Sequence, residues 1–262
     1  MDLSTVLIDL ADENADLDRL VADLAAEAWA RPTPAEGWTV AHQIGHLAWT
    51  DRAALVAATD PEAFTAGLER PVEEILAGLE AGAAEGSRTP PAELLARWRA
   101  DRAALAAALT EVPEGTRVPW YGPPMSATSM ATARLMEAWA HGQDVADGLA
   151  VTRTPTHRLR HIAHIAVRAR GFAYLANGQE LPEKEVVVSL LAPDGTDWTW
   201  GDPDVEQRIE GPALDFCLAA TQRRHLDDLS LQATGPDAEH WLGIVQAYAG
   251  PPGGGRRPGQ FT

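Results

Sequence analysis

The sequence is poor in the features that bind nucleic acid, span membranes or form disulfide bonds. Lysine occurs once, as Lys184, and Lys and Arg together number 21 against 38 Asp and Glu, which gives a formal charge of −17. This balance argues against nucleic-acid partners, because binding to phosphates requires Lys and Arg to displace counterions. It argues equally against anionic membrane surfaces, and no apolar run approaches the roughly 18–20 residues of a membrane-spanning helix.

Cysteine is almost absent. Cys217 is the single cysteine, which excludes an intramolecular disulfide and any multi-cysteine metal site. Its neighbours Phe216 and Leu218 are apolar, so we expect Cys217 to be a small core residue rather than a reactive thiol. A secretory leader is not expected either, because six acidic residues and no basic one precede Arg19. We therefore expect a cytoplasmic protein.

The first part of the chain, residues 1–150, has the pattern of a helical domain. Apolar residues recur there at intervals of three and four, which is typical of amphipathic helices. Helices are expected at about 3–29, 39–59, 89–109 and 126–147, with a shorter one at 73–84. Four major helices with moderate connections predict a four-helix bundle.

Residues 151–250 predict a smaller domain that mixes helices and strands. A dipeptide Asp194-Gly195 between two apolar stretches is typical of a hairpin turn. Helices are expected at 156–176, 211–223 and 238–248, and strands at 186–191, 197–200, 205–209 and 229–234. Residues 251–262 are rich in Gly and Pro and are expected to form a flexible tail. The predicted fold class is thus α+β, a four-helix bundle followed by a smaller α+β domain.

Glu137 and His141 are candidate metal ligands. They are four residues apart on a predicted helix, so both point to one side, one turn apart. A third ligand from another helix would complete a His/Glu/His set with open positions for water or substrate. His46 is the natural third ligand, since bundles often build metal sites from inward-facing Glu and His side chains.

The spacing alone leaves alternatives open. A Glu/His pair at this spacing is also common as an ion pair on a helix surface. His42 and His46 are four residues apart as well and could form a rival pair. The apolar neighbours Met136 and Trp139 favour a buried Glu137, which would need a cationic or metallic partner.

Two motifs resemble those of a known family. The first is W-T-x-A-H-x-x-x-H-L, starting at Trp38, and the second is E-x-W-x-H-x-x-D-V, starting at Glu137. Together they resemble the DinB / mycothiol-dependent maleylpyruvate isomerase-like superfamily. Residues 209–224 and 229–235 are similar to the α/β domain attached to its actinobacterial members.

The resemblance implies a DinB-like four-helix bundle that holds one divalent metal, usually zinc. Its ligands correspond here to His46, Glu137 and His141. The resemblance also implies mycothiol, a low-molecular-weight thiol that coordinates the metal and is deprotonated there. It assigns a catalytic arginine to Arg223, with Arg224 as the rival, because a guanidinium can hold a carboxylate or enolate with two hydrogen bonds. Around these positions the sequence reads T-Q-R-R-H, which departs from the glycine–arginine expected in the isomerase.

Further residues are candidates for the surroundings of the site. Asp144 could orient an imidazole ligand from behind, or be exposed. Three aromatic residues could line a substrate wall or simply pack in the core: Trp49, Trp120 and Tyr121. In the arginine-rich stretch 158–170, His164 and Arg168 could contact an anionic substrate or cofactor, or that helix could balance the charge of an acidic neighbour.

The predicted function is therefore a metal- and mycothiol-dependent isomerase or S-transferase acting on a small, electrophilic, carboxylated substrate. One alternative is a hydrolase or isomerase in which the same metal acts without any thiol. Another is a non-enzymatic protein that binds a small molecule in the bundle. Neither nucleic acid nor a membrane is expected as a partner.

Overall fold

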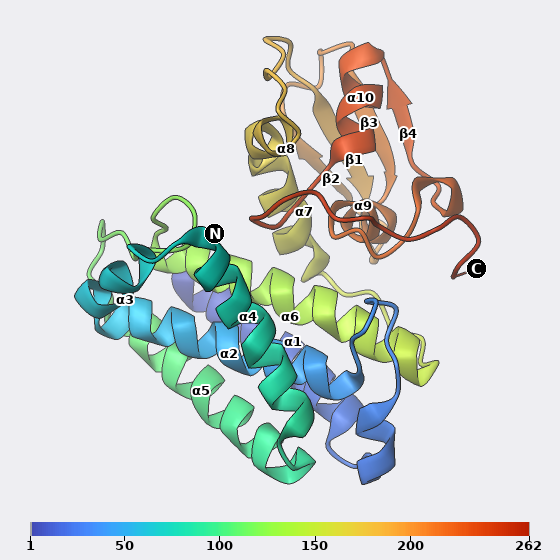
Figure 1. Ribbon diagram of the computed structural model, residues 1–262. Helices are drawn as coiled ribbons and strands as arrows, with labels where there is room; N and C mark the ends of the chain where they lie inside the picture. The colour runs from blue at the N-terminus through green and yellow to red at the C-terminus, as the bar shows by residue number, and fades with distance from the viewer. Residues whose placement is uncertain (1, 262) are drawn as a thin grey trace. The chain divides into compact units, whose positions relative to one another are not determined.

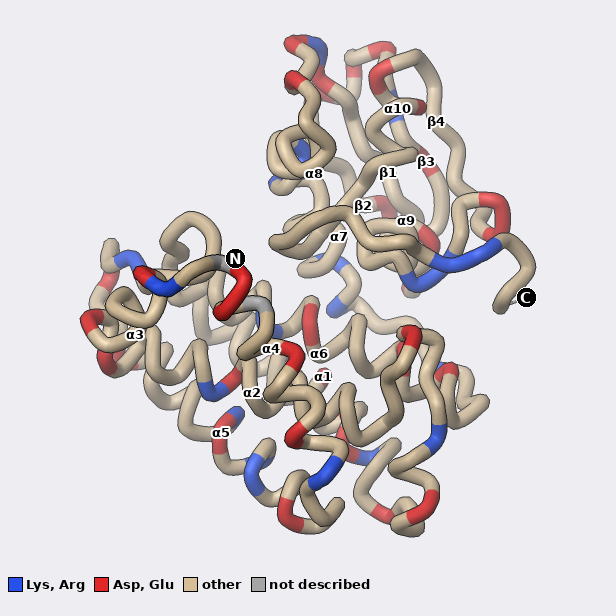
Figure 2. The backbone as a smooth tube through the Cα atoms, in the orientation of Figure 1, with Lys and Arg blue, Asp and Glu red and all other residues tan. Residues whose placement is uncertain are grey.

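The structure is a computed structural model that describes residues 2–261 (Figure 1). The chain divides into two compact units, Met1–Arg153 and Thr154–Thr262. The first unit is helical, and the second combines helices with a four-stranded sheet. The predicted α+β fold class is confirmed. Acidic residues are carried by both units (Figure 2).

Six α-helices and one 3-10 helix build the described part of the first unit. They are α1 (Leu3–Val21), η1 (Ala26–Ala30), α2 (Val40–Thr59), α3 (Pro61–Leu68), α4 (Val72–Arg88), α5 (Pro91–Glu111) and α6 (Ala127–Leu149). α2 is the central element, because it packs against α4, α5 and α6, while α1 packs against α6. The predicted bundle helices are therefore present, and α4, which is longer than predicted, packs along α2 as a further long helix.

The prediction of one helix from residue 3 to residue 29 is wrong at its end. α1 ends at Val21, and the chain turns before η1 begins at Ala26. The turn allows Trp29, which is 3% exposed, to join the same apolar cluster as Val21 and Val40. Trp29 continues the apolar spacing of α1, so the period persists although the helix does not.

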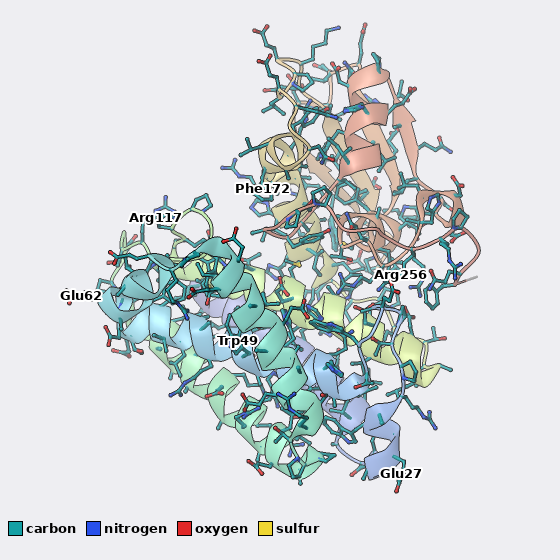
Figure 3. The ribbon with its side chains drawn as sticks, in the orientation of Figure 1. Glu27, Trp49, Glu62, Arg117, Phe172 and Arg256 are labelled. Atoms are coloured by element: carbon teal, nitrogen blue, oxygen red, sulfur yellow. The ribbon has the colours of Figure 1, made fainter. Side chains whose placement is uncertain are left out.

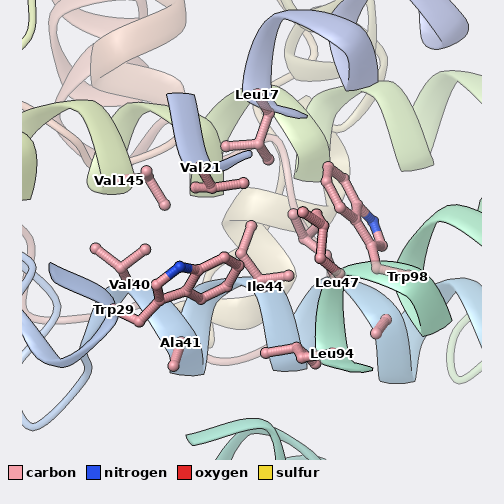
Figure 4. Packing of buried hydrophobic residues seen from close by; sticks show 12 residues of the cluster. Leu17, Val21, Trp29, Val40, Ala41, Ile44, Leu47, Leu94, Trp98 and Val145 are labelled. Carbon is pink, nitrogen blue, oxygen red and sulfur yellow. The ribbon is translucent and has the colours of Figure 1, made fainter. Parts of the chain in front are cut away.

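The core of the first unit lies between α1, α2, α5 and α6 (Figure 4). Val40, Ile44 and Leu47 recur at helical spacing on α2 and lie in one cluster with Trp29 of η1 and Trp98 of α5. Burial of each such side chain stabilises the fold by about 1.5–3 kcal/mol. This packing holds α2 against α6, where the candidate ligands lie.

The second unit consists of a small mixed sheet with helices. Its elements are α7 (Leu159–Arg168), α8 (Arg170–Ala176), β1 (Val187–Leu191), β2 (Asp197–Trp200), β3 (Arg208–Pro212), α9 (Ala213–Ala220), η2 (Leu226–Asp228), β4 (Gln232–Thr234) and α10 (Pro236–Ile244). The strand order is β2-β1-β3-β4. β1 pairs with β3 in parallel, and the β1/β2 and β3/β4 pairs are antiparallel.

Most predictions for the second unit are confirmed, with shifted boundaries. The hairpin turn at Asp194-Gly195 joins β1 and β2, and Gly195 has the positive φ, 83°, that such a turn needs. The helix predicted at 156–176 is two helices, because the backbone departs from helical geometry at Ala169. Cys217 is fully buried, and burial raises the pKa of its thiol, as expected of an inert core cysteine.

Residues 251–261 contain no helix or strand, and Gly259 N donates to the Asp228 carboxylate over 2.8 Å. The predicted flexibility of this tail stays a prediction. Over the described residues, every helix is too short or too polar to span a bilayer.

Candidate metal centre

One group of potential metal ligands stands out among the described residues. His46, Glu137 and His141 bring one ligand atom each to within 4.8 Å of one another. The Nε2 atom of His141 lies 3.1 Å from Glu137 Oε2, and the Nε2 atom of His46 lies 3.5 Å from the same oxygen. The structure thus brings together the three residues that the sequence nominates.

Two antiparallel helices position the three side chains. Glu137 and His141 are one turn apart on α6, so they share one face. His46 comes from α2 and is 7% exposed, and its ring centroid lies 4.4 Å from that of His141. The surface ion pair that the Glu/His spacing also allowed is therefore not what the chain forms.

The charge of the group suits a divalent cation. Burial by itself would raise the pKa of Glu137, but the contacts with the imidazoles of His141 and His46 and the charge of Arg134 outweigh it and hold this pKa well below its ordinary range. The carboxylate is therefore ionised at neutral pH. Two imidazole nitrogens and one carboxylate oxygen form a donor set that zinc and related metals accept.

A tryptophan and a glutamine, both missed by the site prediction from sequence, complete the surroundings. The Trp38 ring lies 5.3 Å from the His46 ring and 6.1 Å from the His141 ring, measured between centroids. Gln43 is fully buried, and its Oε1 lies 2.5 Å from His141 Nδ1. Gln43 could have been found from its spacing, because it precedes His46 by three residues and so shares its helix face.

His42, the rival ligand, has another role. Its Nδ1 accepts a hydrogen bond from Thr39 N over 3.2 Å, and the two residues form a capping box at the start of α2. His42 lies outside the group of converging ligand atoms. The pairing of His42 with His46 as ligands is therefore not formed.

A buried ion pair lies next to the candidate ligands. Arg134 of α6 pairs with Asp51 of α2, and its Nη2 donates to Thr50 Oγ1 over 2.6 Å. Trp98 Nε1 donates to Asp51 Oδ2 over 3.2 Å, and Thr50 Oγ1 donates to the carbonyl of His46 over 2.9 Å. This network connects the backbone at His46 with the helix that carries Glu137, and no local sequence pattern indicates it.

The three aromatic candidates form a cluster of their own. Trp49 (Figure 3) and Tyr121 are stacked with centroids 6.1 Å apart, and Tyr121 lies 5.0 Å from Trp120. Phe64, which is 7% exposed, contacts both Trp120 and Tyr121. These contacts support a packing role, and the substrate wall stays a prediction.

Asp144 is buried on α6, one turn after His141. Gln43 Oε1 lies opposite His141 Nδ1, at the place where we predicted a carboxylate. The role of Asp144 stays a prediction.

The arginine candidates belong to the second unit and follow α9. Arg223 Nη1 donates to the carbonyl of Thr221 over 2.6 Å, and Arg224 Nη1 donates to the carbonyl of Arg223 over 2.7 Å. The guanidinium of Arg224 also lies 4.6 Å from the centre of the Phe261 ring. Gln222 between the helix and these arginines has a positive φ of 59°, which turns the chain there.

The remaining two candidates are on α7. His164 Nδ1 accepts a hydrogen bond from Trp200 Nε1 over 3.2 Å, and burial lowers the pKa of His164. Arg168 is exposed in the last turn of the helix. Their contact with a substrate or cofactor stays a prediction.

Comparison with known proteins extends these observations. A family model for the mycothiol maleylpyruvate isomerase N-terminal domain matches residues 10–146. The chain is also similar to two uncharacterized proteins, one from each of two strains of Mycobacterium tuberculosis. Each is 52% identical over 95% of this chain and 96% of the relative. These matches confirm the resemblance that the two motifs indicate.

Two solved structures share the fold. One is a crystal structure of the mycothiol-dependent maleylpyruvate isomerase, with a TM-score of 0.59, and the other is of a histidine-to-alanine mutant of that enzyme, with a TM-score of 0.61. Each alignment covers 91% of this chain and 96% of the other, at 19% identity. At that identity the likeness concerns the fold alone.

Proposed function

The chain belongs to the mycothiol maleylpyruvate isomerase N-terminal domain family, and on that premise we propose that it is a metal-dependent enzyme that uses mycothiol. The reaction is the isomerisation of a small, electrophilic, carboxylated substrate, or the transfer of the thiol to it. The metal is zinc, and its ligands are His46, Glu137 and His141.

The observation that carries the proposal is the convergence of two imidazole Nε2 atoms on one carboxylate oxygen. Three protein ligands leave coordination positions open, which is typical of catalytic rather than structural zinc. The buried Nδ1 atom of His46 has no hydrogen-bond partner within residues 2–261 as the structure describes them. The Nε2 side of His46 therefore makes its polar contacts within this group.

The residues around the site would hold the metal, shield it from water and orient the substrate. When bound, the divalent cation would lower the pKa of a coordinated thiol, so that the thiolate is available at neutral pH. Glu137 contributes a negative charge, and the two imidazoles contribute neutral donors. Trp38 covers the imidazole rings and keeps water away from that side of the site.

Arg223 is assigned to the substrate by the resemblance, with Arg224 as the alternative. A guanidinium presents two parallel N–H donors that match a carboxylate, and this geometry would fix the orientation of the substrate. The expected signature of this role is an increase in KM for a carboxylated substrate in Arg223→Lys, since lysine cannot form the fork.

Metal content tests the ligand assignment directly. Plasma mass spectrometry should find about one equivalent of zinc per chain, lost in His46→Ala and in Glu137→Gln. His42→Gln is the matched control, because glutamine also serves at this capping-box position while the neighbouring imidazole is removed. A full zinc equivalent in both ligand variants would contradict the assignment.

Thiol dependence tests the reaction. Maleylpyruvate is the first substrate to assay, with and without mycothiol, while free thiol is followed to detect transfer. Turnover that needs mycothiol supports the proposal. Equal turnover without thiol would favour a metal-dependent hydrolase or isomerase, and absence of zinc together with a co-purified small molecule would favour a binding protein.

A further inference from the structure

A chain of hydrogen bonds connects the loop before α2 with the imidazole of His141. The carbonyl of Trp38 accepts from Thr33 Oγ1 over 2.9 Å, and Thr33 Oγ1 accepts from Gln43 Nε2 over 2.9 Å. Gln43 Oε1 then lies 2.5 Å from His141 Nδ1. Gln43 is 0% exposed, so water does not compete for these bonds.

The chemistry of the groups in this series of hydrogen bonds decides which group is the donor and which the acceptor at each bond. The carbonyl of Trp38 is only an acceptor, so the one hydroxyl hydrogen of Thr33 goes to it. Thr33 must then accept from Gln43, and the amide nitrogen of Gln43 faces Thr33. The amide oxygen faces His141 as an acceptor, which requires the hydrogen of the neutral imidazole on Nδ1.

The loop that anchors this chain is closed by backbone hydrogen bonds. Thr33 N donates to the carbonyl of Trp38 over 2.8 Å, and Val40 N donates to the carbonyl of Arg31 over 3.1 Å. Pro32 and Thr39 form an isolated β-bridge between these contacts. The acceptor at the far end of the chain is therefore held by regular backbone geometry.

We propose that Gln43 is a positioning residue that holds His141 as the Nδ1–H tautomer, and that Thr33 holds the amide of Gln43 in the orientation this requires. The lone pair of His141 is then on Nε2, which faces Glu137 Oε2 at 3.1 Å. A lone pair and a carboxylate repel each other unless a cation lies between them. This inference rests on the proposed metal site, because it concerns how one ligand is presented to the metal.

Comparison with His46 shows what the hydrogen bonds through Gln43 contribute to His141. The Nδ1 atom of His46 is buried and has no hydrogen-bond partner among the described residues, so packing orients that ring from behind. His141 is the ligand that is oriented by hydrogen bonding. Groups that orient a metal-bound histidine from behind typically change metal affinity about 10–100-fold when they are lost.

Three substitutions separate the contributions of Gln43 and Thr33 to these hydrogen bonds. Gln43→Met keeps the volume and removes the acceptor, Thr33→Val keeps the shape and removes the hydroxyl, and Gln43→Glu keeps an acceptor toward His141. Gln246→Met is the matched control. Gln246 is 1% exposed and donates to the carbonyls of Tyr248 and Gly250 over 2.8 and 2.9 Å, outside the site.

The first readout needs no metal. Long-range ¹H–¹⁵N correlation spectra of the zinc-free protein report which ring nitrogens of each histidine carry hydrogen. The signals of His141 are identified by their loss in His141→Gln. We expect Nδ1 of His141 to carry hydrogen in the wild type and in Gln43→Glu. In Gln43→Met, the tautomer with hydrogen only on Nε2, which donates to Glu137, should gain population.

The second readout is zinc affinity, measured by competition with a chromogenic chelator. Gln43→Met should bind zinc about 10–100-fold more weakly than the wild type, and the zinc affinity of Thr33→Val should fall by a smaller factor. Gln43→Glu should bind at least as tightly as the wild type. Gln246→Met should lower the melting temperature without changing the tautomer or the zinc affinity.

The outcomes separate this inference from the proposed function. If the wild type binds zinc through the three ligands but Gln43→Met changes neither tautomer nor affinity, the inference is wrong and the metal site stands. If the wild type binds no zinc, the proposed function fails. The tautomer in zinc-free Gln43→Met then still decides, and an unchanged Nδ1–H form overturns the role of Gln43.

Discussion

Arg134 and Asp51 form an ion pair that is buried between α6 and α2. Arg134 Nε lies 2.8 Å from Asp51 Oδ1, and the two side chains are 2% and 6% exposed. Arg134 precedes Glu137 by three residues, so the pair lies one turn from the candidate ligands. Burial raises the pKa of Asp51 although the charge of Arg134 acts to lower it. The ion pair is therefore formed at a cost in desolvation.

Removal of either Arg134 or Asp51 alone should destabilise the protein far more than removal of both. Arg134→Met leaves the Asp51 carboxylate buried and unpaired, which typically costs about 3–5 kcal/mol of unfolding free energy. The double variant Arg134→Met/Asp51→Leu should recover most of this loss. Urea denaturation of the wild type, both single variants and the double variant gives the coupling energy.

An exposed ion pair in the same unit supplies the control. Arg97 and Glu85 are 2.8 Å apart, with side chains 38% and 60% exposed. Arg97→Met should cost no more than about 1 kcal/mol, because solvent screens such pairs. Equal losses in Arg134→Met and Arg97→Met would show that the buried pair does not hold α2 against α6.

Asp18 should make stability depend on pH. It accepts from Arg99 Nε over 2.8 Å and from Arg102 Nη2 over 2.6 Å, which connects α1 with α5. The hydrogen bond from Arg99 is the largest of the effects that hold the pKa of Asp18 below its ordinary value of 3.8. Because this pKa is lowered on folding, the stabilisation is complete above pH 3.8 and is lost as the pH falls through the folded-state pKa.

Asp18→Asn should therefore destabilise the protein by about 1–2 kcal/mol at neutral pH, with the exposure of Arg99 discounted. The difference from the wild type should shrink in acid, as measured by urea denaturation at several pH values. Asp12→Asn, at an exposed position on the same helix, should change stability by less than about 0.5 kcal/mol throughout. A difference for Asp18→Asn that does not change with pH would contradict the role of its charge.

Local patterns predicted most of the helices and strands, but not every end. Thr39 is the N-cap of α2 and Asp194-Gly195 is a turn, because the side chain or backbone of a single residue decides such features. The end of α1 was missed, since Trp29 keeps the apolar period although the chain has already turned. Periodicity records which residues are buried and not the path of the chain between them.

In the candidate site, too, local patterns predict some features, whereas others depend on how the helices pack. Glu137 and His141 follow from spacing within one helix. His46 comes from a distant helix, and there the spacing left His42 as a rival that only the family resemblance set aside. The partnerships of Gln43 with His141 and of Asp51 with Arg134 depend on the register of α2 against α6. That register is set by core packing, which no local pattern contains.

The crossing of α2 and α4 should tolerate no added methyl group. A Cβ atom at Gly45 would lie 2.7 Å from Gly86 Cα, and one at Gly86 would lie 2.4 Å from Gly45 Cα. Alanine favours helices by about 1 kcal/mol over glycine, but overpacking costs about 1–3 kcal/mol. We expect Gly45→Ala to lower the melting temperature.

Gly67 shows the opposite case. It lies in α3, and a Cβ atom there would meet nothing within 4 Å. Gly67→Ala should therefore stabilise the protein by about 0.4–1 kcal/mol. A thermal melt in which Gly45→Ala raises the melting temperature as Gly67→Ala does would contradict the close approach of α2 and α4.

Trp38 should report the occupancy of the metal site. Its ring lies within 6.1 Å of both candidate imidazole ligands, measured between centroids. Cobalt(II) quenches tryptophan emission at short range, whereas zinc does not. Titration with cobalt should therefore lower the emission in step with binding, by a minor part of the total, because Trp38 is one of nine tryptophans. Trp38→Phe should abolish this decrease, while Trp120→Phe, in the separate aromatic cluster, should retain it. The same decrease in Trp38→Phe would mean that cobalt binds elsewhere.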